Sequence, residues 1–91
     1  MRLRDVRWPR GIREKIESKH GLDPDHVESA LFDRRSFIRV VQRGRYFLFG
    51  RADDGSLLVV VFEFEGNDTA RVISARPMTH RERQAYKKQG K

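Results

Sequence analysis

The chain has no cysteine among its 91 residues, which excludes both a disulfide framework and a zinc–thiolate site. Long apolar runs are missing as well. The longest one, residues 57–62, is far too short to span a bilayer, and residues 1–15 lack the apolar stretch of a secretory signal. These absences predict a cytoplasmic protein that does not enter the membrane.

Acidic residues are scarce, since 13 Asp and Glu face 20 Lys and Arg and leave a formal net charge of +7. The excess lies at the two ends: residues 1–19 hold seven basic and three acidic groups, and residues 71–91 hold seven basic groups and one acid. Residues 20–33 hold four acids and no Lys or Arg. If the fold brings both ends together, they form a positive surface suited to a phosphate-bearing polymer, although such a surface can also serve solubility alone.

The capping and turn residues in the first half of the chain predict a short strand and two helices. Without a linker or repeat, residues 1–91 are expected to form a single domain. An edge strand is expected within residues 3–8. A first helix is expected from Pro9, with Gly21 ending it in the left-handed conformation. A second helix follows, with Asp23 as its N-cap.

From residue 36 the pattern changes to short apolar runs separated by turn residues, which is typical of strands. Because residues 57–62 are apolar on both faces, we expect their strand to be central. Thr79 and Glu82 have the spacing of a capping box and begin a C-terminal helix. The expected strands cover residues 36–41, 45–51, 57–64 and 70–76.

Together these elements predict an α+β fold in the order (β)ααββββα. One antiparallel sheet of four to five strands is expected, with two N-terminal helices and one C-terminal helix. The turns between its strands are short, as in an antiparallel meander.

Several segments resemble the BrnT toxins, the ribonuclease partners of BrnT/BrnA toxin–antitoxin modules. They are SKHGL, FLFGRADDGSLLVVVFE and RVISARPMTHRERQAY, and the similarity extends from Trp8 to Lys87. Its most specific part is ISAR followed by RER and a nearby Tyr. Two positions depart from the family pattern: Pro77 follows ISAR, where the family has a basic or polar residue, and the first helix starts with WPRGIREK.

The resemblance implies a RelE-like fold and a toxin that cleaves single-stranded mRNA. It also implies a small ribbon-helix-helix antitoxin of the BrnA type as partner, with operator DNA bound only by the toxin–antitoxin complex. No cofactor is expected. No spacing of His, Asp and Glu predicts a metal site either, and His26 and His80 are expected to be merely exposed.

RNA cleavage without a metal ion requires a base, an acid and cations that stabilise the phosphorane. Arg51 and Arg76 end predicted strands, and a guanidinium can hold two phosphate oxygens at once. Glu82 is a candidate base. Tyr86 follows four residues later on the same helix face and is a candidate proton donor or base-stacking residue. His20 is a candidate general acid–base because imidazole titrates near neutrality. We expect these residues to meet over the carboxyl end of the sheet.

Four of these five catalytic candidates also have a structural explanation. Arg51 could pair with the acidic turn that follows it, and Glu82 could act only in the capping box. Tyr86 could simply dock the last helix, and His20 could stabilise a helix C-terminus. Six further basic residues of the two end segments are expected to bind RNA: Lys19, Arg71, Arg81, Arg83, Lys87 and Lys88.

Two further functions are consistent with the same residues. The chain could be a non-catalytic module that binds nucleic acid or an antitoxin through its basic surface. Alternatively, it could be an orphan toxin that only engages an antitoxin. Pro77 and the lack of one unambiguous general base leave both alternatives open.

Overall fold

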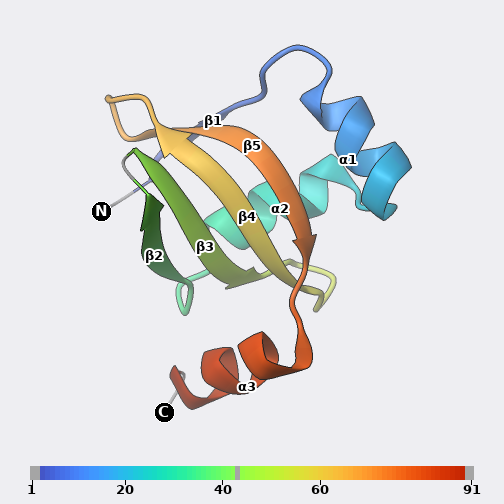
Figure 1. Cartoon of the computed structure of the whole chain (residues 1–91), viewed down its shortest axis with the longest axis vertical. Coiled ribbons are helices and arrows are strands. Elements are labelled where there is room, and N and C mark those ends of the chain that lie inside the picture. Colours follow the sequence, from blue (N-terminus) through green and yellow to red (C-terminus); the bar gives the residue numbers. More distant parts are fainter. Residues whose placement is uncertain (1–2, 43, 90–91) are drawn as a thin grey trace.

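The elements follow one another in the predicted order, β1-α1-α2-β2-β3-β4-β5-α3 (Figure 1). The computed structural model describes residues 3–42 and 44–89, so Arg43 in the predicted turn at 42–44 lies outside the described residues. The strands are β1 (Asp5–Arg7), β2 (Phe37–Gln42), β3 (Arg45–Arg51), β4 (Leu57–Phe64) and β5 (Thr69–Pro77). The helices are α1 (Ile12–His20), α2 (Pro24–Leu31) and α3 (His80–Gln89).

The strands form one mixed sheet with the order β1-β5-β4-β3-β2, in which β4 is central as predicted. β2 to β5 pair antiparallel, whereas β1 pairs parallel to β5, with Asp5 opposite Thr69 and Arg7 opposite Arg71. The prediction of a purely antiparallel sheet is therefore wrong at this edge. A parallel neighbour needs a long crossover, and the chain between β1 and β5 supplies one.

Capping residues set the helix ends, with one difference from the prediction. α1 begins at Ile12 rather than at Pro9, because Gly11 has a φ of 83° and interrupts the helical backbone. The chain turns there, and the Ile12 N–H donates to the Pro9 carbonyl at 3.1 Å. At the other end Gly21 has a φ of 63°, which confirms the predicted left-handed cap. Asp23 accepts a hydrogen bond from the N–H of Asp25 at 2.9 Å and caps α2, as predicted.

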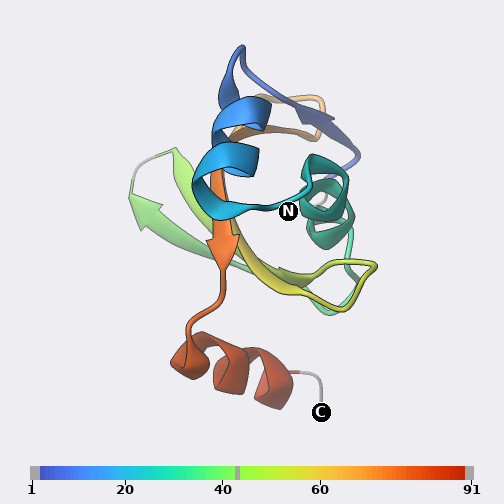
Figure 2. The same ribbon diagram turned by 90° about the vertical axis from the view of Figure 1, so that its right-hand side faces the viewer.

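α1 and α2 cover one face of the sheet and form the main core with it (Figures 1 and 2). Ile16 of α1 and Val27 of α2 are buried there against apolar residues of β4 such as Phe62. α2 approaches β3 so closely that a Cβ on Gly50 would lie 2.4 Å from the carbonyl oxygen of Ala30. Glycine at this position therefore lets helix and strand pack without a side chain between them.

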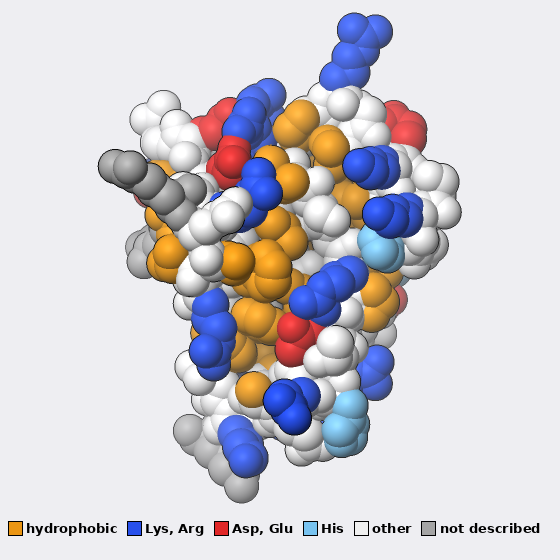
Figure 3. Space-filling model, in the orientation of Figure 1, with side chains coloured by type: hydrophobic (Ala, Val, Ile, Leu, Met, Phe, Trp, Pro, Cys, Tyr) orange, Lys and Arg blue, Asp and Glu red, His pale blue; other side chains and the backbone are white. Residues whose placement is uncertain are grey.

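α3 covers the opposite face of the sheet only at one end. A second, smaller core forms there from Phe49, Val59, Met78 and Tyr86. The remainder of this face is not covered by a described helix, and Figure 3 shows hydrophobic side chains there among Lys and Arg side chains. We call this remainder the open sheet face and define it by its half-buried apolar residues Phe37, Phe47 and Val61.

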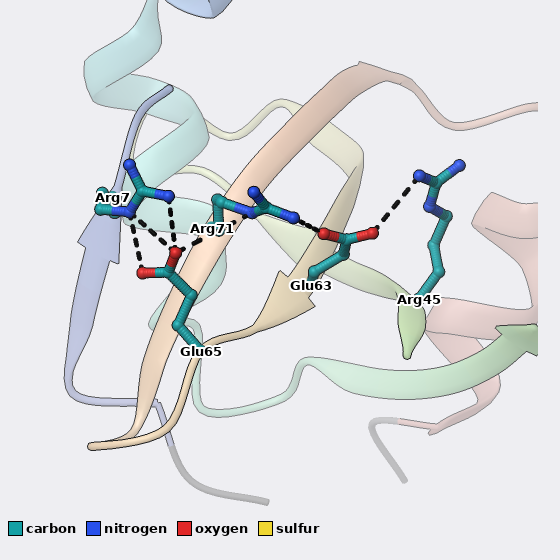
Figure 4. Close-up of polar contacts among 5 residues, drawn as sticks. All are labelled: Arg7, Arg45, Glu63, Glu65 and Arg71. Atoms are coloured by element: carbon teal, nitrogen blue, oxygen red, sulfur yellow. Dashed lines mark hydrogen bonds and ion pairs between the residues drawn. The ribbon is translucent and has the colours of Figure 1, made fainter. Parts of the chain in front are cut away.

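A ladder of charged side chains crosses four strands near the start of β5 (Figure 4). Arg7 on β1 pairs with Glu65 at 2.6 Å, and Arg71 on β5 pairs with Glu63 on β4. Arg45 on β3 pairs with the same Glu63 at 3.4 Å. Ion pairs exposed to solvent in this way contribute little to stability, so the ladder mainly supports strand register.

Candidate functional site

A charged pair joins the end of β5 to the first turn of α3. Arg76 donates from Nη1 and Nη2 to the two carboxylate oxygens of Glu82, at 2.8 and 2.9 Å. Glu82 also accepts the N–H of Thr79 at 2.8 Å, and its own N–H donates to the Thr79 hydroxyl at 3.2 Å, which confirms the predicted capping box. The Glu82 carboxylate therefore caps the helix and holds Arg76 at the same time.

This pairing fixes the charge of both side chains. The hydrogen bonds from Arg76, assisted by those from Thr79, lower the pKa of Glu82 to about 2. The same bonds to Glu82 raise the pKa of Arg76 above its ordinary value. A carboxylate with so low a pKa is a poor proton acceptor near neutrality. The geometry therefore indicates that Glu82 positions Arg76 rather than acting as the base.

The low pKa of Glu82 predicts acid sensitivity of the fold. In the unfolded chain its pKa returns to about 4.5, so the stabilisation is complete above that pH and is lost as the pH falls towards 2. We expect wild type to lose about 2–3 kcal/mol of unfolding free energy from this group between pH 6 and pH 2. Urea unfolding at several pH values measures it, and Glu82→Gln should flatten the profile. Equal profiles for both proteins would contradict the assignment.

A narrow groove separates the end of α1 from the second half of β5. Among the described residues β1 pairs with β5 only as far as Arg71, so the following edge of β5 lies open beside α1. The groove has a volume of about 150 Å³. We call it the α1–β5 groove; its lining residues are Lys15, Ile16, Lys19, His20, Ile73 and Ser74.

The α1–β5 groove brings part of the basic N-terminal segment to the strand that carries Arg76. Lys19 is exposed and His20 is half-buried at the end of α1. Ser74 lies two residues before Arg76 on β5, so the two side chains leave the strand on the same side. No hydrogen bond or ion pair found among the described residues involves the His20 ring, which leaves its nitrogens open to a ligand in the groove.

Tyr86 docks the second half of α3 onto the loop between α2 and β2. Its side chain is only 7% exposed, and its hydroxyl donates to Asp33 Oδ2 at 2.5 Å. The N–H groups of Arg51 and Arg35 also donate to Asp33, at 2.8 and 3.1 Å. Burial, together with the contact to Asp33, raises the pKa of Tyr86 to about 12, so the phenol keeps its proton at neutral pH.

Asp33 is the residue of this region that the sequence reasoning missed. Partial burial favours its neutral form, but the hydrogen bonds from Tyr86, Arg35 and Arg51 outweigh that effect and hold its pKa below the ordinary value. The available signal was weak: one acid directly after the second helix and before two arginines. Its partner Tyr86 is 53 residues away in the chain, and no local pattern reports such a contact.

Beside Tyr86 lies a larger cavity of about 420 Å³, between α3 and the turn that joins β3 to β4. We call it the α3 pocket; it is lined by Arg35, Arg51, Gly55, Leu57, Tyr86 and Lys87. Arg51 thus lies beside Tyr86 of α3, whereas Arg76 binds Glu82 of the same helix. Glu82 precedes Tyr86 by one helical turn, or about 6 Å along the helix axis. The expected single cluster is therefore divided. Arg76 with Glu82 and Arg51 with Tyr86 form two adjacent parts along α3, whereas His20 lies in the α1–β5 groove.

The other residues predicted to bind RNA are dispersed. Arg71 takes part in the charge ladder (Figure 4). It lies five residues before Arg76 on β5, a distance of about 16 Å along an extended strand. Arg81, Arg83 and Lys88 are exposed on α3. Only Lys87 also lines the α3 pocket.

His26 is not merely exposed as predicted, because its ring lies between two carboxylates. Its Nε2 is 3.7 Å from Asp53 and its Nδ1 is 3.2 Å from Asp54, both in the β3–β4 turn. These three residues are spaced closely enough to hold a metal ion. Their mutual pairing already accounts for the arrangement, and Asp54 also accepts two hydrogen bonds from Ser56.

Comparison with known proteins identifies a family. The sequence profile described as "Ribonuclease toxin, BrnT, of type II toxin-antitoxin system" matches residues 8–82. Among solved structures, the fold is similar to the crystal structure of the Brucella abortus ribonuclease toxin BrnT. The TM-score is 0.68 at 26% sequence identity, and the match covers 84% of this chain and 97% of that one. A search of curated proteins finds no match.

No helix within residues 3–42 and 44–89 is both long enough and apolar enough to cross a membrane.

Proposed function

Because this chain belongs to the BrnT family of ribonuclease toxins of type II toxin–antitoxin systems, we propose that it cleaves mRNA in the α1–β5 groove without a metal ion. One observation carries the proposal: the groove places Lys19 and His20 beside β5, the strand that carries Arg76 two residues beyond the groove-lining Ser74. These three side chains supply a proton acceptor and two cations, the groups that attack by a 2′-hydroxyl requires.

In this mechanism neutral His20 takes the proton from the 2′-hydroxyl, and the 2′-oxygen attacks the adjacent phosphorus. Arg76 and Lys19 stabilise the charge that develops on the phosphorane oxygens. The bond to the 5′-oxygen then breaks, that oxygen takes a proton from water, and protonated His20 gives its proton to the hydroxide that remains. The products are a 2′,3′-cyclic phosphate and a free 5′-hydroxyl.

Glu82 contributes by positioning Arg76. Its two hydrogen bonds hold the guanidinium, which also lies over the Phe47 ring, 5.9 Å from the ring centroid. A side chain held in this way loses little further entropy when phosphate binds. Pro77 does not disturb this arrangement, because it still pairs with Leu58 at the end of β5 and its carbonyl accepts a bond from Arg76 at 3.2 Å.

The family implies an antitoxin partner, which we propose is a small ribbon-helix-helix protein that covers the open sheet face. Phe37 and Phe47 are half-buried there, and each lies under an arginine, Arg39 at 5.6 Å and Arg76 at 5.9 Å from the ring centroid. An antitoxin segment with apolar and acidic side chains complements this surface. It would hide Arg76 from RNA in the cytoplasm, and operator DNA would be bound only by the complex.

The test is an RNA cleavage assay with purified protein in EDTA. We expect unstructured RNA to be cut into products with 2′,3′-cyclic phosphate ends, because the proposed mechanism places no step on a metal ion. Cleavage that requires added Mg²⁺ would contradict metal independence. Folded protein that binds RNA with a steep salt dependence yet never cuts it would identify a non-catalytic module instead.

Two controls belong to the same assay. RNA methylated at every 2′-oxygen should stay intact, since its attacking group is blocked. Added antitoxin should stop cleavage; an antitoxin that binds without stopping it would contradict the proposal that it covers Arg76.

A further inference from the structure

We propose that the α3 pocket is a second phosphate-binding subsite, which holds a phosphodiester of the RNA next to the one that is cleaved. The proposal rests on the ribonuclease function proposed above. It assigns a role to Arg35, Arg51 and Lys87, none of which takes part in the cleavage mechanism. The subsite would orient the RNA strand across α3 instead of acting on the scissile bond.

The three cations of the pocket come from three separate elements. Arg35 precedes β2, Arg51 ends β3, and Lys87 lies in the second half of α3. Among the described residues, no hydrogen bond or ion pair uses any of these three side chains. The fold therefore gathers three like charges around a cavity of about 420 Å³, an arrangement that costs free energy unless an anion binds there.

Asp33, an acidic residue beside the pocket, is committed to the scaffold. Asp33 accepts the N–H groups of Arg35 and Arg51 and the hydroxyl of Tyr86. These bonds fix the backbone from which the two arginines project and the helix from which Lys87 projects. Asp33 thus organises the pocket. Asp54, which precedes Gly55 in the β3–β4 turn, is paired with His26 and Ser56 instead. The described residues that line the pocket include three cations and no acid, which leaves it positive.

Size and position favour an RNA phosphodiester as the ligand. The cavity lies in the range of about 300–1,000 Å³ that accommodates small-molecule ligands, enough for a nucleotide rather than a single carboxylate. Leu57 gives it an apolar wall for a sugar or base edge. Tyr86 of the pocket and Glu82, which holds Arg76, are one helical turn apart on α3, or about 6 Å. A polynucleotide carries a charge at every unit, so neighbouring phosphates of one strand can occupy both places.

The test measures binding of a 12-nucleotide RNA methylated at every 2′-oxygen, by fluorescence anisotropy at several salt concentrations. Arg35→Gln should raise Kd about tenfold at low salt, since a bidentate charged contact is lost. Its slope of log K against log salt should fall by about 0.7, the loss of one phosphate contact to a single strand. Lys87→Gln should act in the same direction, which keeps the test decisive if one variant does not fold.

Arg34→Gln is the matched control, because Arg34 is the exposed neighbour of Arg35 and does not line the α3 pocket. It removes the same charge from the same loop, and its Kd should stay within about twofold of wild type. If Arg34→Gln and Arg35→Gln weaken RNA binding equally, the subsite is overturned, because the overall positive charge of the surface would then explain both effects. Normal RNA binding by Arg35→Gln with weakened antitoxin binding would also overturn it and assign the pocket to the antitoxin.

The outcome is separable from that of the proposed function, because the methylated RNA reports binding alone. If wild type leaves ordinary RNA uncut while Arg35→Gln still weakens binding, the cleavage proposal fails and the subsite stands. If wild type cuts RNA and Arg35→Gln binds normally, the subsite fails and the cleavage proposal stands.

Discussion

Replacing Arg76 with alanine is expected to lower kcat for RNA cleavage about 10²- to 10³-fold, the usual loss when a preorganised donor to a transition-state oxyanion is removed. The guanidinium is held in place before substrate arrives, by two hydrogen bonds to Glu82 and by the Phe47 ring beneath it. Its charge is fixed as well, because the bonds to Glu82 raise the pKa of Arg76. Single-turnover cleavage of a fluorescent RNA measures the loss.

Two variants separate this role from a general loss of positive charge. Arg81→Ala removes an exposed arginine from the first turn of α3, next to Glu82, and its rate should stay within a few-fold of wild type. Arg76→Lys keeps the charge but cannot form the two-point contact with Glu82, so an intermediate rate is expected. Folded Arg76→Ala that cuts RNA at the wild-type rate would remove Arg76 from the mechanism.

α3 shows how a helix with little apolar surface is held in a small domain. Tyr86 is its one buried residue in the described range. Polar contacts anchor the helix at two points, Glu82 to Arg76 and Tyr86 to Asp33. The same contacts position cations, since Glu82 holds Arg76 and Asp33 holds the backbone of Arg51. The stability of the helix and the geometry of both candidate binding places thus depend on the same few bonds.

Local signals made most of the fold predictable from the sequence. Gly21, Asp23 and the Thr79–Glu82 capping box each act within a few residues, and all three are confirmed in the structure. The apolar character of residues 57–62 placed β4 at the centre of the sheet, because only a strand covered on both faces can keep such a sequence in water.

What the sequence did not reveal depends on contacts between distant residues. The three residues of β1 carry no signal for direction, so its parallel pairing with β5 was not predicted. The Tyr86–Asp33 bond spans 53 residues, and the His26 ring reaches a turn in another part of the chain. The candidate site was predicted as a list of side chains; its division between groove and pocket follows from where α3 docks.

His20→Ala is expected to lower kcat about 10²- to 10⁴-fold, the range that general acid–base catalysis contributes. Initial rates of RNA cleavage in EDTA measure the loss.

The matched control is His80→Ala, which removes an exposed histidine from the first turn of α3. Its cleavage rate should match wild type, since His80 is not among the residues that line the groove. A folded His20→Ala protein that keeps the wild-type rate would rule out His20 as the base. The half-buried imidazole at the end of α1 would then act only by stabilising the helix C-terminus, where a positive charge is favourable.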